Sequence, residues 1–325
     1  MNEYEVRIPL NTGEQPEVVS PEPASKKKRP SKLERREHWI AFAFILPPIV
    51  GFLVFTAISM GATFIYSFQN YYVRRDTSEF VGFTHYLTLF KQMGTIGTTG
   101  HEFLKAIGNT LFLLLSIPIS IVLGLLLAGL LRLGDIKGGK VYQILYYLPA
   151  VSSAVALNIV WRYMFQSNGL LNTIFGASTP WLFDDTLVKV AIIIKNSLNA
   201  MGGAMILYFA GMLNVSKELY EASSLDGASK VRQFFSITLP LITPVTFYLL
   251  ITGLIGGLQS YADAQVFATA DGDASTIVFF IWNYKNKSSA SGYGIASAAS
   301  IVLSIAIMIV TIVQFKLSNK WVYEE

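Results

Sequence analysis

The chain has 325 residues, of which 52% are hydrophobic and only 14% are charged, and its mean hydropathy is +0.47. Because an average soluble domain is about a quarter charged, this composition argues against a soluble enzyme and predicts a membrane protein. The net charge of +4 does not indicate nucleic-acid binding, since most basic residues lie beside apolar segments, where they orient a chain in the bilayer. The sequence contains no cysteine, which excludes disulfides, thiolate metal sites and cysteine nucleophiles.

Residues 1–37 form a polar tail that ends in a basic run. The run contains Lys26, Lys27, Lys28, Arg29, Lys32, Arg35 and Arg36 and directly precedes the first apolar segment. This tail holds too few apolar residues for a core, so we expect it to be disordered. We interpret the run as a cytoplasmic anchor that contacts anionic membrane lipid, with a nucleic-acid-binding arm as the alternative.

Six apolar segments reach the roughly 20 residues that a helix needs to cross a bilayer. They lie near Trp39–Phe64, Thr110–Leu131, Val141–Phe165, Leu187–Leu213, Leu241–Tyr261 and Gly294–Phe315. The predicted fold is an all-α membrane protein with six transmembrane helices in one domain, residues 38–316, followed by a short tail, residues 317–325. The outer loop Ser67–Gly108 is too short for a further domain, but it is long enough for an interfacial helix.

The distribution of basic residues predicts the orientation of the chain. An even number of crossings places both termini on one side, together with the loops that follow the second and fourth segments. The basic run, these two loops and Lys316 with Lys320 hold fifteen of the 25 lysine and arginine residues, whereas the opposite loops hold fewer and carry interspersed acids. By the positive-inside rule, both termini and the loop at residues 216–240 are cytoplasmic.

The loop Ser216–Pro240 is polar and carries both signs of charge between two apolar segments. Its first part predicts a short helix, Lys217–Leu225, that ends at the turn signal Asp226-Gly227. A second helical stretch follows, with Val231, Phe234 and Phe235 spaced to share one apolar face. An ordinary loop between two membrane helices is the alternative to a functional role.

This loop resembles that of the membrane subunits of bacterial ATP-binding-cassette importers. Their pattern is Glu-Ala-Ala, a glycine six residues after the glutamate, and Ile-x-Leu-Pro, and these places hold Glu221, Ala222, Ser223, Gly227, Ile237, Leu239 and Pro240. The one departure is Ser223 for the second alanine, and we expect this small residue to be without consequence. Stretches such as VGFTHYLTLF, AIGNT, YYLPA, GLLN and GYGIASAAS also match the carbohydrate-importer branch, so the resemblance runs from about Trp39 to Phe315.

The resemblance implies a permease subunit of a sugar or oligosaccharide importer in the bacterial cytoplasmic membrane. In that family the loop forms a coupling helix seated in a groove of a separate cytoplasmic ATPase subunit. The coupling residues would be Glu221, Ala222, Ser223, Asp226 and Gly227. The other partners implied are a second permease subunit, in a heterodimer with a homodimer as the alternative, and an extracellular or periplasmic solute-binding protein.

The sequence predicts no nucleotide site, cofactor, metal or catalytic residue of its own. The stretch Gly134–Val141 fits G-x-x-x-x-G-K, but it ends in Val where a phosphate-binding loop needs a Ser or Thr hydroxyl, and a membrane helix precedes it. The three histidines are scattered without the spacing of metal ligands.

Polar residues within the crossings indicate the substrate path, because polar groups at membrane depth usually face a cavity or another helix. Lys195, Asn196 and Asn199 form one polar stripe on the fourth segment. In related permeases the places of Asn199–Met201, Leu258 and Tyr261 border the sugar. The residues expected along the path are Asn196, Asn199, Met201, Leu258, Gln259 and Tyr261. Hydrogen bonding between helices is the alternative for each of them, and for Lys195 so is snorkelling to the outer surface.

Two other functions compete with an ATP-driven importer. A secondary transporter coupled to an ion gradient predicts buried acidic residues, and no Asp or Glu lies well inside a predicted crossing. A membrane scaffold or sensor would leave the polar stripe of the fourth segment unexplained.

Overall fold

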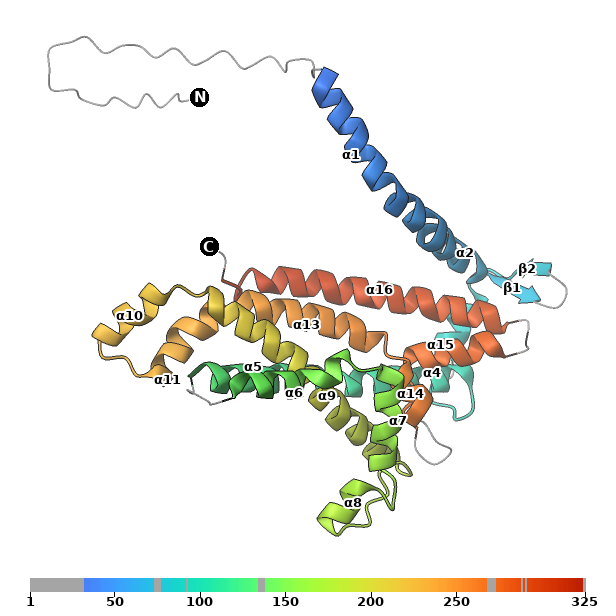
Figure 1. Ribbon diagram of the computed structural model, residues 1–325. Coiled ribbons are helices and arrows are strands. Elements are labelled where there is room, and N and C mark those ends of the chain that lie inside the picture. Colours follow the sequence, from blue (N-terminus) through green and yellow to red (C-terminus); the bar gives the residue numbers. More distant parts are fainter. Residues whose placement is uncertain are drawn as a thin grey trace, which may run out of the picture. The chain divides into compact units, whose positions relative to one another are not determined.

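The computed structural model describes residues 32–72, 77–91, 93–133, 138–267, 273–287, 289 and 291–323. This part of the chain is almost entirely helical (Figure 1). The chain divides into two compact units between Ser59 and Met60. The basic run Lys26–Arg29, residues Gly134–Lys137 of the phosphate-loop-like stretch, and the end of the C-terminal tail lie outside the described residues.

The elements follow one another as α-helices with two π-helical stretches, η1 and η2, and one pair of strands. Their bounds are α1 Lys32–Gly51, η1 Phe52–Ala57, α2 Ile58–Tyr66, β1 Gln69–Tyr72, β2 Thr77–Phe80, α3 Thr84–Phe90, α4 Thr99–Leu113, α5 Ser116–Leu133, α6 Gly139–Val151, α7 Ala154–Met164, α8 Leu170–Phe175, α9 Asp185–Asn214, α10 Lys217–Leu225, α11 Lys230–Gln233, η2 Phe234–Thr238, α12 Leu239–Leu241, α13 Thr243–Leu258, α14 Ala262–Phe267, α15 Ile277–Asn286 and α16 Gly292–Ser318.

Four helical stretches among the described residues are long and apolar enough to cross a membrane unaided. They are Trp39–Tyr66, Thr99–Arg132, Asp185–Asn214 and Gly292–Ser318. Two more stretches qualify only as bent pairs, α6 with α7 at 100° and Lys230–Leu241 with α13 at 58°. The structure therefore contains four to six candidate crossings.

The third predicted crossing, Val141–Phe165, is not one continuous helix. Helix α6 contains Pro149 and ends at Val151, and α7 starts afresh at Ala154. Ser152 closes the first helix through its backbone N–H to the carbonyl of Pro149, and the Ser153 hydroxyl caps the second by accepting from the N–H of Ala156. The predicted crossing is therefore divided, because the two serines end one helix and start another.

The ends of the first predicted crossing also differ from expectation. Helix α1 begins at Lys32, so it includes Arg35 and Arg36, which were assigned to a disordered tail. The physical reason is that Lys, Leu, Glu and Arg are good helix formers. In the outer loop, α3 lies within the stretch predicted as an interfacial helix, and an antiparallel hairpin of β1 and β2 precedes it without having been predicted.

The second unit is built around close helix pairs, of which α5 with α9 is the most extensive. Figure 1 shows α13 and α16 running side by side, and α10 and α11 together at one end. Glycines allow the backbones to approach: a methyl group at Gly202 of α9 would overlap the carbonyl oxygen of Tyr146 in α6. Gly253 and Gly257 of α13 likewise leave room for Ile117.

We expect Gly202→Ala to destabilise the protein by about 1–3 kcal/mol, the usual cost of overpacking, because α6 must move away from α9. The matched control is Gly203→Ala on the same helix, where the added methyl meets no atom within 4 Å. Thermal unfolding in detergent measures both. A Gly202→Ala protein that is as stable as Gly203→Ala would contradict this packing.

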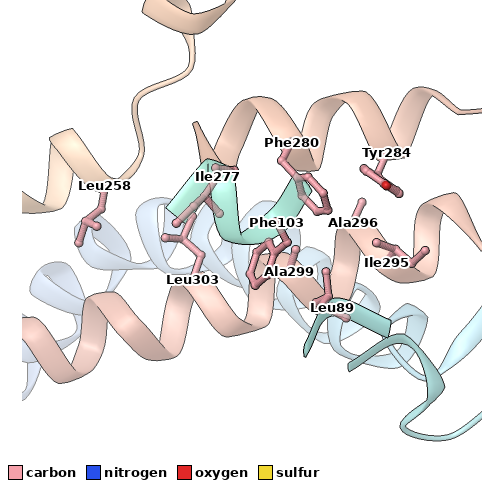
Figure 2. Packing of buried hydrophobic residues seen from close by; sticks show 12 residues of the cluster. Leu89, Phe103, Leu258, Ile277, Phe280, Tyr284, Ile295, Ala296, Ala299 and Leu303 are labelled. Carbon is pink, nitrogen blue, oxygen red and sulfur yellow. The ribbon is translucent and has the colours of Figure 1, made fainter. Parts of the chain in front are cut away.

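A hydrophobic core lies where α4, α13, α15 and α16 meet (Figure 2). The rings of Phe103 and Phe280 lie 5.3 Å apart between their centroids. Ala296 and Ala299 of α16 are buried beside them, and their small side chains make room for both rings. The small residues at the start of α16 therefore allow close packing of the helices in this core.

Two of the stretches that match the importer family, AIGNT and GLLN, contain side chains that hydrogen-bond to the backbone of other segments or of their own loop. Asn109 donates to the carbonyl of Ser275 at 3.1 Å, and the Thr110 hydroxyl accepts from the N–H of Ile277 at 3.0 Å, which fixes the start of α15. Asn172 donates to the carbonyls of Ser167 and Thr179 and so holds the loop around α8.

Candidate functional site

The second unit contains a cavity of about 660 Å³ among α5, α6, α7, α9 and α13. Much of its wall is small and apolar, including Gly203, Gly253 and Gly256. The polar part consists of hydroxyls and amides together with one lysine and one aspartate. These residues are Ser116, Ser120, Ser152, Asn158, Lys195, Asn196, Asn199, Thr252, Ser260, Tyr261 and Asp263. These groups are suited to exchanging hydrogen bonds with a hydroxyl-rich molecule.

A buried ion pair forms the centre of the polar wall. Lys195 of α9 is 3% exposed and pairs with Asp263 of α14, whose side chain is 11% exposed. The Lys195 ammonium also donates to Asn158 of α7 at 2.7 Å, and Asn196 donates to the second carboxylate oxygen of Asp263 at 2.7 Å. Asn158 adds a longer bond to Asp263 at 3.3 Å. Three helices are therefore joined by one network in which each charge faces its opposite.

This network decides between the alternatives for Lys195 and adds an acidic residue from outside the predicted crossings. Lys195 does not snorkel to the outer surface, because it is buried and pairs with a carboxylate in the interior. No Asp or Glu lies well inside a predicted crossing, but Asp263, from just beyond one, is only 8% exposed in the folded chain. Asp263 lies two residues beyond the predicted end of the fifth crossing, where α13 has ended at Leu258 and α14 has begun.

The six residues expected along the substrate path divide into two groups. Asn196, Asn199 and Tyr261 line the cavity, and Asn199 also accepts a hydrogen bond from the Trp161 indole at 3.1 Å. Leu258 is 5% exposed and belongs to the core of Figure 2. Met201 and Gln259 are not among the described residues that line the cavity.

Sequence reasoning missed Asp263 and Asn158, the two partners of Lys195. A lysine in the middle of an apolar segment was the available signal, because a buried charge at membrane depth requires a partner. The sequence alone did not indicate which of the acids outside the crossings folds back to it.

The Ser216–Pro240 loop forms the short helix α10 with the predicted bounds, Lys217–Leu225. The Ser216 hydroxyl caps its start by accepting from the N–H of Glu218 at 3.2 Å. Gly227 follows with φ +78°, a left-handed conformation that glycine adopts without strain. Glu221 and Ala222 are exposed, and Leu225 is 91% exposed. The helix thus presents motif residues and an apolar tip to its surroundings.

Ser223, the one departure from the importer pattern, takes part in a contact that the sequence analysis did not expect. The amide nitrogen of Gln233 shares its two hydrogens among three acceptors, the Ser223 hydroxyl at 2.9 Å, the Ser224 hydroxyl at 2.8 Å and the carbonyl of Tyr220 at 3.2 Å. Ser223 therefore makes a side-chain contact that the alanine of the importer pattern could not make.

The two ends of the second unit differ in charge. At one end Arg132, Lys217 and Lys230 line a pocket of about 350 Å³ in which Glu221 is the acidic residue. The C-terminus lies at the same end, because the N–H of Tyr323 donates to Thr243 at the start of α13. Basic groups from distant parts of the chain are thus collected on one side.

At the other end, charges of both signs alternate. The Lys105 ammonium lies 3.1 Å from Asp185 and 3.0 Å from Asp273. Burial raises the pKa of Asp273, but hydrogen bonds from Ser275 and the adjacent ammonium outweigh it and hold the pKa below its usual value. No group of three or more acidic or histidine side chains in the described part of the chain is arranged to hold a metal ion.

Comparison with known proteins places the chain among transport proteins. A family model described as "Binding-protein-dependent transport system inner membrane component" matches residues 103–322. The chain is 29% identical over 303 residues to the probable ABC transporter permease protein YesP of Bacillus subtilis (strain 168), covering 91% of this chain and 95% of YesP. It is 28% identical over 290 residues to the arabinooligosaccharides transport system permease protein AraP of the same organism, covering 86% and 88%.

The fold is shared with a solved transporter. A crystal structure of a bacterial ABC transporter involved in the import of the acidic polysaccharide alginate contains a chain that superposes with a TM-score of 0.76 at 24% sequence identity. The match covers 88% of this chain and 96% of that chain.

Proposed function

Since this chain belongs to the family of binding-protein-dependent transport system inner membrane components, we propose that it lines the membrane pathway for a neutral sugar or short oligosaccharide. It is a permease subunit of an ATP-binding-cassette importer in the bacterial plasma membrane, and a separate subunit hydrolyses ATP. The observation that carries the sugar assignment is the 660 Å³ cavity. Its amides and the Tyr261 ring suit a ligand rich in hydroxyl groups, and its two charges neutralise each other.

The proposed topology has six crossings, with each bent pair crossing once. Both termini and the Ser216–Pro240 loop then lie on the cytoplasmic side. The collection of Arg132, Lys217 and Lys230 in one pocket supports this orientation, because positive residues are retained on the cytoplasmic side of a membrane. The region around Lys105 would face outward, toward a solute-binding protein.

In the proposed cycle, α10 is the coupling helix that a cytoplasmic ATPase subunit moves. Glu221, Ala222, Ser223, Asp226 and Gly227 would form or shape its contact with that subunit. The exposure of Leu225 supports the assignment, since a large apolar side chain at a helix tip is suited to a groove of a partner. A second permease of the same fold would complete the pathway, in a heterodimer.

The test begins with mild-detergent purification through a tag on this chain and identification of the proteins that come with it. We expect an ATPase and a second permease. The purified assembly is then reconstituted in liposomes and supplied with its solute-binding protein and candidate neutral oligosaccharides. Uptake should require ATP. Recovery of the chain alone with full uptake in liposomes that lack ATP would identify a secondary carrier and contradict the proposal.

A further inference from the structure

Helix α10 is attached to the rest of the protein by few apolar contacts. None of its residues is buried, and Leu219 and Leu225 are 46% and 91% exposed. Tyr220 differs from these residues because it is partly buried. Its side chain packs against the core formed by α5, α9 and the start of α13. A helix that must pass a movement to the membrane pathway therefore needs another connection.

Gln233 supplies that connection. Its side chain is 8% exposed, and its amide nitrogen lies within 3.2 Å of three acceptors on α10: the Tyr220 carbonyl and the hydroxyls of Ser223 and Ser224. Both serine hydroxyls donate in turn to the Tyr220 carbonyl, at 3.0 and 2.8 Å. We call this group, Gln233 with Tyr220, Ser223 and Ser224, the amide clamp. Shielding from water strengthens hydrogen bonds of this kind.

A second contact runs parallel to the amide clamp. The Tyr220 hydroxyl bonds to the Thr238 hydroxyl at 2.8 Å, and Thr238 is 4% exposed. Tyr220 is thus held at both its backbone and the tip of its ring by residues of α11 and η2. The turn at Asp226-Gly227, which joins the two helices in sequence, is exposed, so the clamp and this contact set the angle between them.

The segment that carries Gln233 leads directly into the wall of the cavity. Helix α11 continues through η2 and α12 to Ile242, which is 1% exposed and lies in the same core as Met212. Helix α13 begins at the next residue and brings Gly253 and Gly256 to the cavity. A rotation of α10 therefore reaches α13 only if α10 and α11 move as one body.

We propose that Gln233 is a positioning residue of the transport cycle: through the amide clamp it makes α10 and α11 a single rigid lever that transmits the stroke of the ATPase to α13. The inference rests on the proposed function of the loop. Ser223 belongs to the clamp, so the residue that departs from the importer pattern and the glutamine ten positions later act together in one hydrogen-bonded group. Ser223→Ala alone should have a small effect, because two of the three acceptors remain.

The test measures sugar taken up per ATP hydrolysed by the complete importer in liposomes. In Gln233→Glu, a carboxylate replaces the donor and faces the Tyr220 carbonyl. We expect the ratio to fall at least about fivefold, the factor that corresponds to one net hydrogen bond. Gln233→Leu removes the donor without adding charge and should act in the same direction.

The structural control is Arg232→Gln, at the exposed neighbour on the same helix, which should couple normally. The amount of ATPase subunit that co-purifies should stay unchanged in the Gln233 variants, because the exposed face of α10 is intact. A merely structural residue would lower the yield of the complex instead of the uptake per ATP. Wild-type coupling in both Gln233→Glu and Gln233→Leu would overturn the proposal.

Glu221→Lys, measured in the same complex, separates this inference from the function on which it rests. If Glu221→Lys disturbs coupling and the Gln233 variants do not, the loop is correctly assigned and the amide clamp has no role in it. If Glu221→Lys and the Gln233 variants all transport normally, the loop itself is not the coupling element.

Discussion

Replacing Asp263 with asparagine is expected to cost about 3–5 kcal/mol of stability, the penalty for leaving one member of a buried ion pair without its partner. The substitution hardly changes the shape of the side chain, but it leaves the Lys195 ammonium, 3% exposed, without a compensating charge. The effect should appear as a large loss of monodisperse protein after extraction and as a lower midpoint of thermal unfolding in detergent.

The complementary variants make this expectation specific to the pair. Lys195→Met leaves Asp263 with its hydrogen bonds from Asn158 and Asn196, and should be destabilised as well. The double variant Lys195→Met/Asp263→Asn removes both charges, so it should be more stable than the sum of the single effects predicts, because residues in contact are not additive.

The exposed acid Glu79 of β2 provides the control, and Glu79→Gln should change stability by no more than about 0.5 kcal/mol. Additive effects of the two cavity substitutions would show that Lys195 and Asp263 do not interact.

The place of Lys195 in this ion pair could be predicted from the sequence, but the identity of its partner Asp263 could not. The i, i+1 and i+4 spacing of Lys195, Asn196 and Asn199 marks a polar stripe whatever the tertiary structure is. The partner Asp263 comes from 68 positions further along the chain, and it reaches Lys195 only because α13 ends early and α14 turns back. A helix end set by tertiary packing cannot be derived from hydropathy.

Local chemistry explains where the sequence predicted the structure well. The bounds of α10 follow from the Ser216 cap and from Gly227, both of which act within one helical turn. The break between α6 and α7 was missed because Pro149 indicates a kink without its angle, and the 100° bend depends on two serines that end one helix and begin the next. The amide clamp was missed because Ser223 was compared with the alanine of a pattern and not with a partner ten residues away.

Gly227→Pro is expected to abolish uptake while leaving the protein in the membrane. Proline fixes φ near −65°, whereas Gly227 has φ +78°, so the turn after α10 cannot form. Proline also removes the backbone N–H that donates to the Ser224 carbonyl at 3.1 Å. No atom lies within 4 Å of the position where a side chain would begin, so the helices of the membrane bundle should be undisturbed.

Charge reversal at Glu221 tests the same lever without changing its backbone. Glu221→Lys should let ATP hydrolysis proceed without uptake, because the introduced lysine on α10 would repel whatever basic group of the ATPase the glutamate meets. The matched control is Glu218→Lys, the same charge change three residues earlier on the same exposed helix. Uptake and ATP hydrolysis are measured side by side in liposomes.

Two substitutions at position 227 distinguish the effect of the backbone conformation from the effect of adding a side chain. Asparagine tolerates the left-handed conformation better than other non-glycine residues, so Gly227→Asn should retain much of the uptake that Gly227→Pro loses. If uptake is lost equally in both, the ATPase requires the bare surface of glycine and not the turn. Normal uptake by both Gly227→Pro and Glu221→Lys would mean that the stroke enters the membrane by another route, because neither the angle nor the charge of α10 would then matter to transport.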